Sequence, residues 1–547
     1  MWNYLLRIVA AAVSVLAVTS SAGADPVGPS IPSIQVLPAP DQDKPELVFT
    51  IHRTLAPGAP AGIPAPTDLT YRIHQAPITV DDVTHSMPPA GRGSRKPKLE
   101  TNHATPLDYV VVVSKQTQAD PEWGQVVRAL AFKRHADILV YDGSVTDVRT
   151  EMARQMPRYA CFVARPEEAG RAFVIAVHRV TRKLNNDPYT DVIWGILTGY
   201  SPIDALRIIS VDDPLVIRKG AGGTSIPLDL FHEGVWYDEG RKNHMVRKTA
   251  DGKIEDGRCA DDTTSALVDT LNTFQPDLFV TSGHASESNW LIGYSYRNGQ
   301  FRCKDGVLYG IDTTGHAYPV HSPNPKVYVA VGNCLMGHVK DRQAMALAFM
   351  GSGGVDQMIG YVVETWFGYG GWGILDYFQG QAGRFSLAES FFLNNQALIY
   401  KLHKEFPDKA DVEPSPEEAT SVEKIAALLG YSQWNDSVKE NVGLVYDRDV
   451  VAFYGDPAWD ARLDHRSLAW DQKLTRRGNI YTFELTANQD VDPGRPPAAL
   501  FPRRLRGVRV LKGQEFEPVI TGSFLLMPKP AHLEKGKTYR VVFEAAS

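Results

Sequence analysis

The sequence predicts an α/β protein in which a mostly parallel sheet is covered by helices on both faces. Short runs of β-branched and aromatic residues, typical of buried strands, stand at 109–113, 138–141 and 159–163. Helix-like segments follow at 121–134 and from 166 to about 182. Strands that alternate with helices form parallel sheets, because the crossover between two parallel strands needs a dozen residues or more.

Two further apolar runs, at 278–280 and 327–331, lead into reactive side chains, the first into His284 and the second into Cys334. Neighbouring parallel strands end at the same edge of a sheet, where open α/β folds place their sites. An imidazole beside a thiol raises the thiolate fraction and can later protonate a leaving amine. The pattern indicates a nucleophile, Cys334, with His284 as its base. The alternative is a buried core thiol and a loop histidine, the common interpretation of any single Cys or His.

The surroundings of both residues resemble the gingipain family of clan CD cysteine peptidases, a clan that also includes caspases and legumains. The segment GHASESNW at 283–290 is similar to the family's histidine motif GHGSExxW, and VGNC at 331–334 stands where the family has its catalytic cysteine. The strand at 357–360 and the Thr-Trp pair at 365–366 resemble the strand and Trp-bearing loop that follow that cysteine. Gly-Asp-Pro at 455–457 resembles the close of the catalytic domain.

The resemblance implies a caspase-like catalytic domain at 105–463, with an oxyanion hole made by the N–H groups of Ala285 and Cys334. Ala285 departs from the family pattern, which has glycine there, and is acceptable only where the backbone suits a residue with a Cβ. The substrate pocket is assigned to Trp290 and Trp366.

An acidic segment with Asp187 and Asp191 precedes the apolar run at 192–198. In the gingipain family an acidic, Tyr-containing segment in this region helps to shape the substrate pocket. The resemblance therefore implies that Asp187 or Asp191 orients His284 or lines that pocket. The alternative is a turn-forming Asp-Pro and an exposed aspartate.

The two ends of the chain differ in composition from this α/β layer. Residues 1–24 are typical of a secretory signal, because a basic residue and a short apolar run precede small residues at 22–24. Residues 25–104, rich in Pro and Gly, are expected to form a small β-rich region and a linker, with a removable pro-segment as an alternative. Short alternating runs after 463 predict an immunoglobulin-like β-sandwich at 464–547.

Charge, hydropathy and cysteine content argue against several classes of protein. A net charge of −6 argues against a general nucleic-acid binder, and no stretch after the signal suggests a membrane anchor. Four cysteines are too few for a disulfide-built scaffold. With Cys334 as nucleophile and Cys161 in an apolar run, Cys259 and Cys303 are expected to form a disulfide in an oxidising compartment.

His316, His321 and His338 raise the alternative of a metal site, but neither a His-x-x-x-His nor a paired Cys-x-x-Cys motif supports it. No cofactor and no metal are expected, although the resemblance leaves structural calcium open. The sequence thus predicts a secreted or periplasmic cysteine endopeptidase that hydrolyses peptide or protein substrates through a Cys-His dyad and a thioester acyl-enzyme. The competing class is a non-catalytic caspase-like module that binds peptides or protein partners.

Overall fold

The computed structural model describes residues 34–38, 46–51, 68–76 and 109–546. The expected signal at 1–24 and most of the expected linker region lie outside these residues. The first described segments form a three-stranded sheet of β1 (Ile34–Pro38), β2 (Glu46–Ile51) and β3 (Leu69–His74). All three strands lie within 25–104, the region expected to be β-rich.

Residues 109–546 contain one large sheet with two halves. The strands of one half are parallel to one another: β4 (Tyr109–Ser114), β5 (Asp137–Tyr141), β6 (Tyr159–Val163), β7 (Ile193–Leu197) and β21 (Val451–Tyr454). The strands of the other half are also parallel to one another: β9 (Lys219–Gly222), β10 (Glu233–Tyr237), β13 (Leu278–Thr281), β19 (Lys326–Ala330) and β20 (Val355–Tyr361). Two antiparallel strands, β11 (Met245–Lys248) and β12 (Ile254–Gly257), extend this second half beyond β10.

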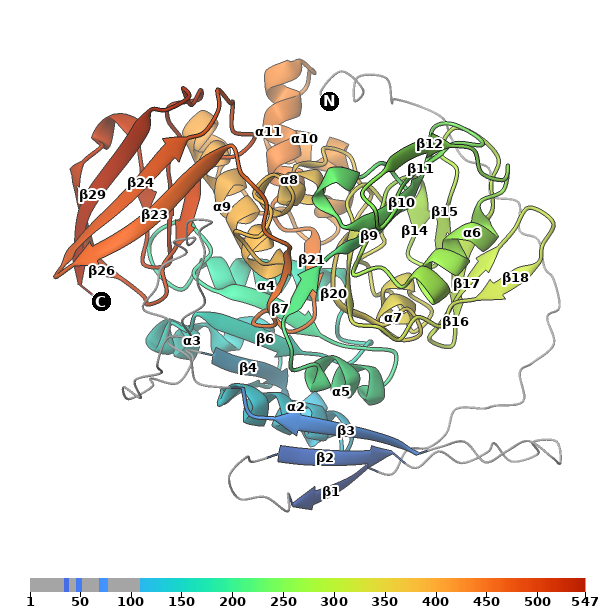
Figure 1. Ribbon diagram of the computed structural model, residues 1–547. Coiled ribbons are helices and arrows are strands. Elements are labelled where there is room, and N and C mark those ends of the chain that lie inside the picture. The colour runs from blue at the N-terminus through green and yellow to red at the C-terminus, as the bar shows by residue number, and fades with distance from the viewer. Residues whose placement is uncertain (1–33, 39–45, 52–67, 77–108, 547) are drawn as a thin grey trace, which may run out of the picture. The chain divides into compact units, whose positions relative to one another are not determined.

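The strand order in this sheet is β12-β11-β10-β9-β13-β19-β20-β21-β7-β6-β4-β5 (Figure 1). The sheet is mixed and mostly parallel, as the alternation of strands and helices predicts. Its two halves run in opposite directions, because β20 and β21 pair antiparallel. The sequence did not predict this reversal, since a buried strand shows the same apolar run in either direction. The caspase-like topology stays a prediction.

Helices cover both faces of the sheet (Figure 1). α4 (Arg171–Arg182) and α9 (Leu387–Glu405) meet on one face, where His178 and Phe391 pack around Trp194 with ring centroids 4.8 and 5.2 Å away. On the other face, α2 (Trp123–Arg134) packs against α5 (Pro202–Ser210). The other α-helices are α1 (Lys115–Ala119), α3 (Arg149–Gln155), α6 (Thr264–Asp269), α7 (Met345–Met350), α8 (Tyr369–Phe378), α10 (Val422–Leu428) and α11 (Asp436–Asp447).

A smaller antiparallel sheet begins directly after His284. Its strands are β14 (Ala285–Ser286), β15 (Asn289–Leu291), β16 (Gln300–Lys304), β17 (Val307–Ile311) and β18 (Ala317–Pro319). The histidine turn is therefore held on one side by the large sheet and on the other by this hairpin sheet.

The C-terminal region contains two antiparallel sheets. One has the order β23 (Trp470–Arg477), β24 (Ile480–Ala487), β29 (Thr538–Ala546), β26 (Arg506–Lys512), and the other has the order β25 (Ala498–Leu500), β28 (Phe524–Leu526), β27 (Val519–Ile520). Both contribute to one apolar core that includes Phe483, Leu525 and Phe543. Two sheets around a shared core form a sandwich. The immunoglobulin topology of this sandwich stays a prediction.

A separate two-stranded parallel sheet pairs β8 (Leu215–Ile217) with β22 (Ala461–Leu463).

Candidate active site

The turns that carry His284 and Cys334 leave the same edge of the large sheet. Strands β13 and β19 are parallel neighbours in register up to Thr281 opposite Ala330. The pairing continues past the strands, because the Val331 N–H donates to the Thr281 carbonyl at 3.2 Å. His284 follows the first strand and Cys334 the second, so the sheet brings both turns together in the way expected from the sequence.

A buried asparagine ties the two turns together. Asn333 is fully buried; its Nδ2 donates to the Gly283 carbonyl at 3.2 Å, and its Oδ1 accepts from the Thr281 hydroxyl at 2.5 Å. Asn333 and Gly283 directly precede the candidate nucleophile and base. The amide therefore fixes the spacing of the two backbones that carry the pair.

The Cys334 thiol is half-buried, and its Sγ accepts a hydrogen bond from the Thr365 N–H at 3.3 Å. Burial raises the pKa of this thiol, the Glu364 carboxylate raises it further, and the bond from Thr365 lowers it in part. An ordinary thiol already has a pKa of about 8.5. The thiol is therefore protonated at neutral pH, and an attack by its sulfur needs a base.

Alkylation of Cys334 by iodoacetamide is expected to reach its half-maximal rate at a higher pH than alkylation of a free Gly-Cys dipeptide. A raised pKa leaves less thiolate at any given pH, so the rate rises later in the pH series. Mass spectrometry of the peptide that contains Cys334 measures this rate. A midpoint below that of the dipeptide would reveal a thiolate already stabilised by an imidazolium and contradict the prediction.

The His284 ring is exposed and stacks on the Tyr294 ring, with centroids 4.7 Å apart and planes 19° apart. Burial raises the pKa of the Tyr294 phenol, and the charges of Glu239 and Cys334 raise it further. Tyr294 is therefore a neighbour of the imidazole. No hydrogen bond joins the imidazole to the thiol among the described residues, a common state of catalytic pairs before substrate binds.

A short hairpin fixes the turn after His284. Gly283 has a φ of +98°, a conformation that favours glycine. Ala285 lies in β14 opposite Trp290, where extended backbone accommodates its Cβ. The Leu291 N–H donates to the His284 carbonyl at 2.9 Å, which marks Ala285 and Trp290 as a non-hydrogen-bonded pair. The hairpin ladder therefore does not use the Ala285 N–H.

The two tryptophans expected in the substrate pocket have different surroundings. Trp290 is fully buried, and its Nε1 donates to the Ser282 carbonyl at 2.9 Å, so it supports the histidine turn and has no surface for a substrate. Trp366 is half-buried and packs edge-to-face on Trp434 with centroids 6.0 Å apart. It directly follows the residue whose N–H contacts the Cys334 sulfur.

The acidic segment contacts the C-terminal strands and not the histidine turn. Arg504 donates to the Asp191 carboxylate at 3.2 Å, and the Ser523 hydroxyl donates to the Asp191 carbonyl at 3.0 Å. Burial raises the pKa of the Asp191 carboxyl to about 7, although Arg504 lowers it. Asp187 accepts the Tyr189 N–H at 2.9 Å within its own turn. Neither aspartate is bonded to the histidine turn in these contacts, so the expectation that one of them orients His284 is wrong, and the role in the substrate pocket stays a prediction.

A carboxylate near the site was not predicted. Glu239 follows β10, and its Oε1 accepts from the Thr224 hydroxyl at 2.9 Å. Its Oε2 lies 3.2 Å from the position of a Cβ at Gly283. Burial raises the pKa of this carboxyl to about 7, although the Thr224 and Ser282 hydroxyls lower it. A glutamate in a charged loop gives no sequence signal that it lies near the histidine turn. Glu239 lies there because β9 pairs with β10 on one side and with β13 on the other.

The four cysteines of the chain are all described and all free. The expected disulfide between Cys259 and Cys303 is wrong, because the Cys303 thiol instead donates to the Gln343 carbonyl at 2.9 Å. Within the described ranges, no three His, Cys, Asp or Glu side chains gather in a way that could hold a metal ion. No helix in the described part of the chain is long and apolar enough to cross a membrane.

Comparisons with known proteins give little further information. No protein-family model and no curated protein matches the chain. A solved structure described as "Structure of Protease" is similar at 10% sequence identity with a TM-score of 0.32, over 81% of this chain and 95% of the other. A similarity at this level does not establish a shared fold, so the function proposed below rests on the residues of this chain.

Proposed function

We propose that the chain is a cysteine endopeptidase in which Cys334 is the nucleophile and His284 is the general base and acid. The observation that carries this proposal is the register of β13 and β19, which delivers both turns to one sheet edge. Asn333 links the backbones of these turns. A free, half-buried thiol and an exposed imidazole at such an edge suit acyl transfer.

In the proposed reaction, His284 accepts the thiol proton as the Cys334 sulfur attacks the carbonyl carbon of a peptide bond. The N–H groups of Ala285 and Cys334 then stabilise the oxyanion. The tetrahedral intermediate collapses when the C–N bond breaks and His284 protonates the leaving amine, which leaves a thioester. Water attacks the thioester, His284 takes a proton from the water and returns one to the sulfur, and the carboxylic acid is released.

Glu239 adds a group that the sequence did not suggest. Its carboxyl, with a pKa raised to about 7, lies behind Gly283 and next to Tyr294, on which His284 stacks. In the ionised form this carboxylate would stabilise a nearby imidazolium by charge. We therefore assign Glu239 a positioning role for the histidine turn.

We also propose roles for the parts of the chain outside the catalytic domain. The signal at 1–24 supports export to the periplasm or the medium, and the region at 25–104 precedes the catalytic domain at 105–463. The domain at 464–547 supports the catalytic layer, since Arg495 lies over the Tyr369 ring of α8 at 3.5 Å from its centroid. Structural calcium stays open by resemblance alone.

The second candidate is a caspase-like module that binds peptides without cleaving them. The raised pKa of the Cys334 thiol favours it, because a thiol without a bonded base is a weak nucleophile. The two candidates differ in one observable product, the acyl-enzyme, which forms only in a peptidase.

A fluorogenic peptide library and a thiol-directed peptide inhibitor test the proposal together. The purified chain should cleave at least one peptide class, and mass spectrometry should locate the inhibitor on Cys334. Labelling of Cys303, the other half-buried thiol near the hairpin sheet, would show accessibility without catalytic activation. An absence of both cleavage and labelling would refute the peptidase.

Asn333→Ala is expected to reduce peptide cleavage about tenfold or more, because small displacements of catalytic groups cost up to about a hundredfold. The loss of two buried hydrogen bonds should also lower the free energy of unfolding by about 1–3 kcal/mol. Asn441→Ala is the matched control: Asn441 is equally buried but lies in α11, where its Oδ1 accepts from the Tyr431 hydroxyl at 3.1 Å. Equal losses of cleavage in the two variants would reduce Asn333 to a role in folding.

A further inference from the structure

The imidazole of His284 has no hydrogen-bonded group to orient it. In the part of the chain that the structure describes, neither a hydrogen bond nor an ion pair joins a ring nitrogen of His284 to another group. In a nucleophile–base pair, a third group commonly orients the base. The contact that the structure does give this ring is its stack on Tyr294.

The stack limits how the imidazole can turn. The ring centroids of His284 and Tyr294 lie 4.7 Å apart, with 19° between the ring planes. Aromatic rings attract one another in offset-stacked arrangements at centroid distances of about 4.5–7 Å. An imidazole stacked in this way cannot rotate about its Cβ–Cγ bond without losing the contact. Tyr294 therefore restricts the plane in which the two ring nitrogens of His284 lie.

The backbone of Tyr294 is anchored to the residues that follow β10. The Tyr294 N–H donates to the Glu239 carbonyl at 2.7 Å, and the Ser295 N–H donates to the same oxygen at 3.2 Å. The Tyr296 hydroxyl donates to the Asp238 carbonyl at 2.9 Å. Asp238 and Glu239 directly follow β10, a strand of the large sheet. These hydrogen bonds therefore fasten the turn that carries Tyr294 to the large sheet.

The residues before Tyr294 leave this turn little freedom. A Cβ at Gly293 would collide with the Tyr296 carbonyl oxygen, so the turn closes tightly. Ile292 is fully buried, and its N–H donates to the Gly299 carbonyl at 3.2 Å. Tyr294 is therefore held in place by its own neighbours, which a residue that orients a functional side chain requires.

The stack also suits the charge that develops in the proposed reaction. When His284 takes the proton of the Cys334 thiol, its imidazole gains a positive charge. A cation over the face of a tyrosine ring, within about 6 Å of the centroid, is attracted by the ring electrons. Tyr294 can therefore orient the neutral imidazole and stabilise the charged one.

We propose that Tyr294 is a positioning residue for His284, because its ring sets the orientation in which the imidazole takes up and returns the proton of Cys334. This role rests on the proposed function, to which it adds a residue that no motif indicates. It belongs to the ring of Tyr294 and not to the hydroxyl, since the ring makes the contact. Phenylalanine should therefore replace Tyr294, and leucine should not.

Tyr294→Leu should lower kcat for peptide cleavage about tenfold and leave KM unchanged, because the base is misoriented while the substrate still binds. Tyr294→Phe should retain the wild-type kcat. Tyr318→Leu is the matched control: Tyr318 of β18 packs on His316 with ring centroids 4.5 Å apart, away from the candidate dyad, so kcat should not change. An unchanged kcat in Tyr294→Leu, or an equal loss in Tyr294→Phe, overturns the role of the ring.

Chemical modification separates this role from the proposed function. Diethyl pyrocarbonate acylates exposed imidazoles, and mass spectrometry measures the rate at His284 without any cleavage of substrate. This rate should rise severalfold in Tyr294→Leu, whose imidazole turns freely, and keep its wild-type value in Tyr294→Phe. His321, an exposed histidine outside the site, should react equally in all variants.

The two measurements give distinct outcomes. If the wild type cleaves no peptide while the rate at His284 rises in Tyr294→Leu alone, the peptidase fails and the orienting stack stands. If the wild type cleaves peptides and the rate at His284 is the same in all variants, the peptidase stands and the stack does not orient the imidazole.

Discussion

Cys334→Ala should reduce peptide cleavage to background, a loss of about three orders of magnitude or more, and should remove labelling by thiol-directed peptide inhibitors. No other described thiol can replace it at that sheet edge. Cys161 is fully buried in β6, and the Cys303 thiol is bonded to the Gln343 carbonyl. Cys259 follows β12, the outermost strand of the large sheet, from which β11, β10 and β9 separate β13. Cleavage of the fluorogenic peptide found in the library screen measures the effect.

His284→Ala should cost nearly as much, because the thiol of Cys334 is protonated at neutral pH and needs a base. The double variant should be no less active than either single variant, since residues that act as one catalytic unit are strongly non-additive. The fold should survive, because the imidazole is exposed and the thiol is half-buried. Thermal unfolding of each variant verifies this.

Cys303→Ala is the matched control for both variants. Cys303 is also free and half-buried, and burial raises the pKa of its thiol to about 12, so it is protonated and its removal should leave cleavage unchanged. Undiminished cleavage by Cys334→Ala would refute the cysteine-peptidase proposal. Undiminished cleavage by His284→Ala alone would leave the nucleophile in place and assign the proton transfer to another group.

The positions of His284 and Cys334 could be predicted because their signal is local. Each follows a short apolar run, and the register of β13 and β19 turns that sequence order into one sheet edge. The place of Trp366 in the substrate pocket follows from the resemblance to the gingipain family and stays a prediction. What the sequence could not supply is the link between the turns, because the role of Asn333 depends on hydrogen bonds to Gly283 and Thr281 from another part of the chain.

The wrong predictions share a physical cause: each concerns contacts between residues that are far apart in the sequence. Asp187 and Asp191 were placed near the histidine by analogy, whereas Arg504 and Ser523 of the C-terminal region bind the second of them. The Cys259–Cys303 disulfide was inferred from compartment and elimination, which carry no information on distance. Glu239 reaches the site only because β10 pairs with β9, and β9 with β13.

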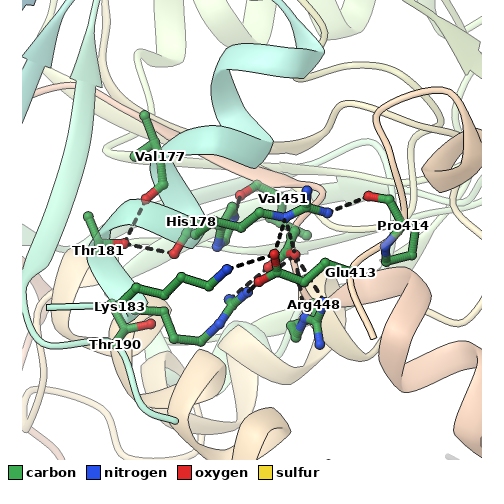
Figure 2. A network of polar contacts seen from close by, with 12 residues as sticks. Val177, His178, Thr181, Lys183, Thr190, Glu413, Pro414, Arg448 and Val451 are labelled. Carbon is green, nitrogen blue, oxygen red and sulfur yellow. Dashed lines mark hydrogen bonds and ion pairs between the residues drawn. The ribbon is translucent and has the colours of Figure 1, made fainter. Parts of the chain in front are cut away.

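A buried ion cluster lies just before β21, the strand that pairs antiparallel with β20 where the sheet reverses (Figure 2). The Asp449 carboxylate accepts from Arg182 at 2.7 Å, from Arg179 at 3.2 Å and from Arg448 at 3.3 Å. Glu413 adds a second carboxylate, 3.6 Å from Arg182. Burial alone would raise the pKa of Asp449, but Arg182 and Arg448 hold it well below its ordinary value. The cluster therefore fastens α4 to the strand that joins the two halves of the sheet.

Asp449→Ala should lower the free energy of unfolding by about 3–5 kcal/mol, because it leaves the buried guanidinium groups of Arg182 and Arg448 without their main partner. Since the folded pKa is depressed, this contribution is present above the ordinary carboxyl pKa of about 3.9 and is lost as the pH falls through the folded value. Urea unfolding at neutral pH measures it. Glu151→Ala is the control, because the Glu151–Arg154 pair is exposed on α3 and its loss should leave the stability unchanged. If Asp449→Ala unfolds at the same urea concentration as Glu151→Ala, the cluster does not stabilise the junction of the two halves.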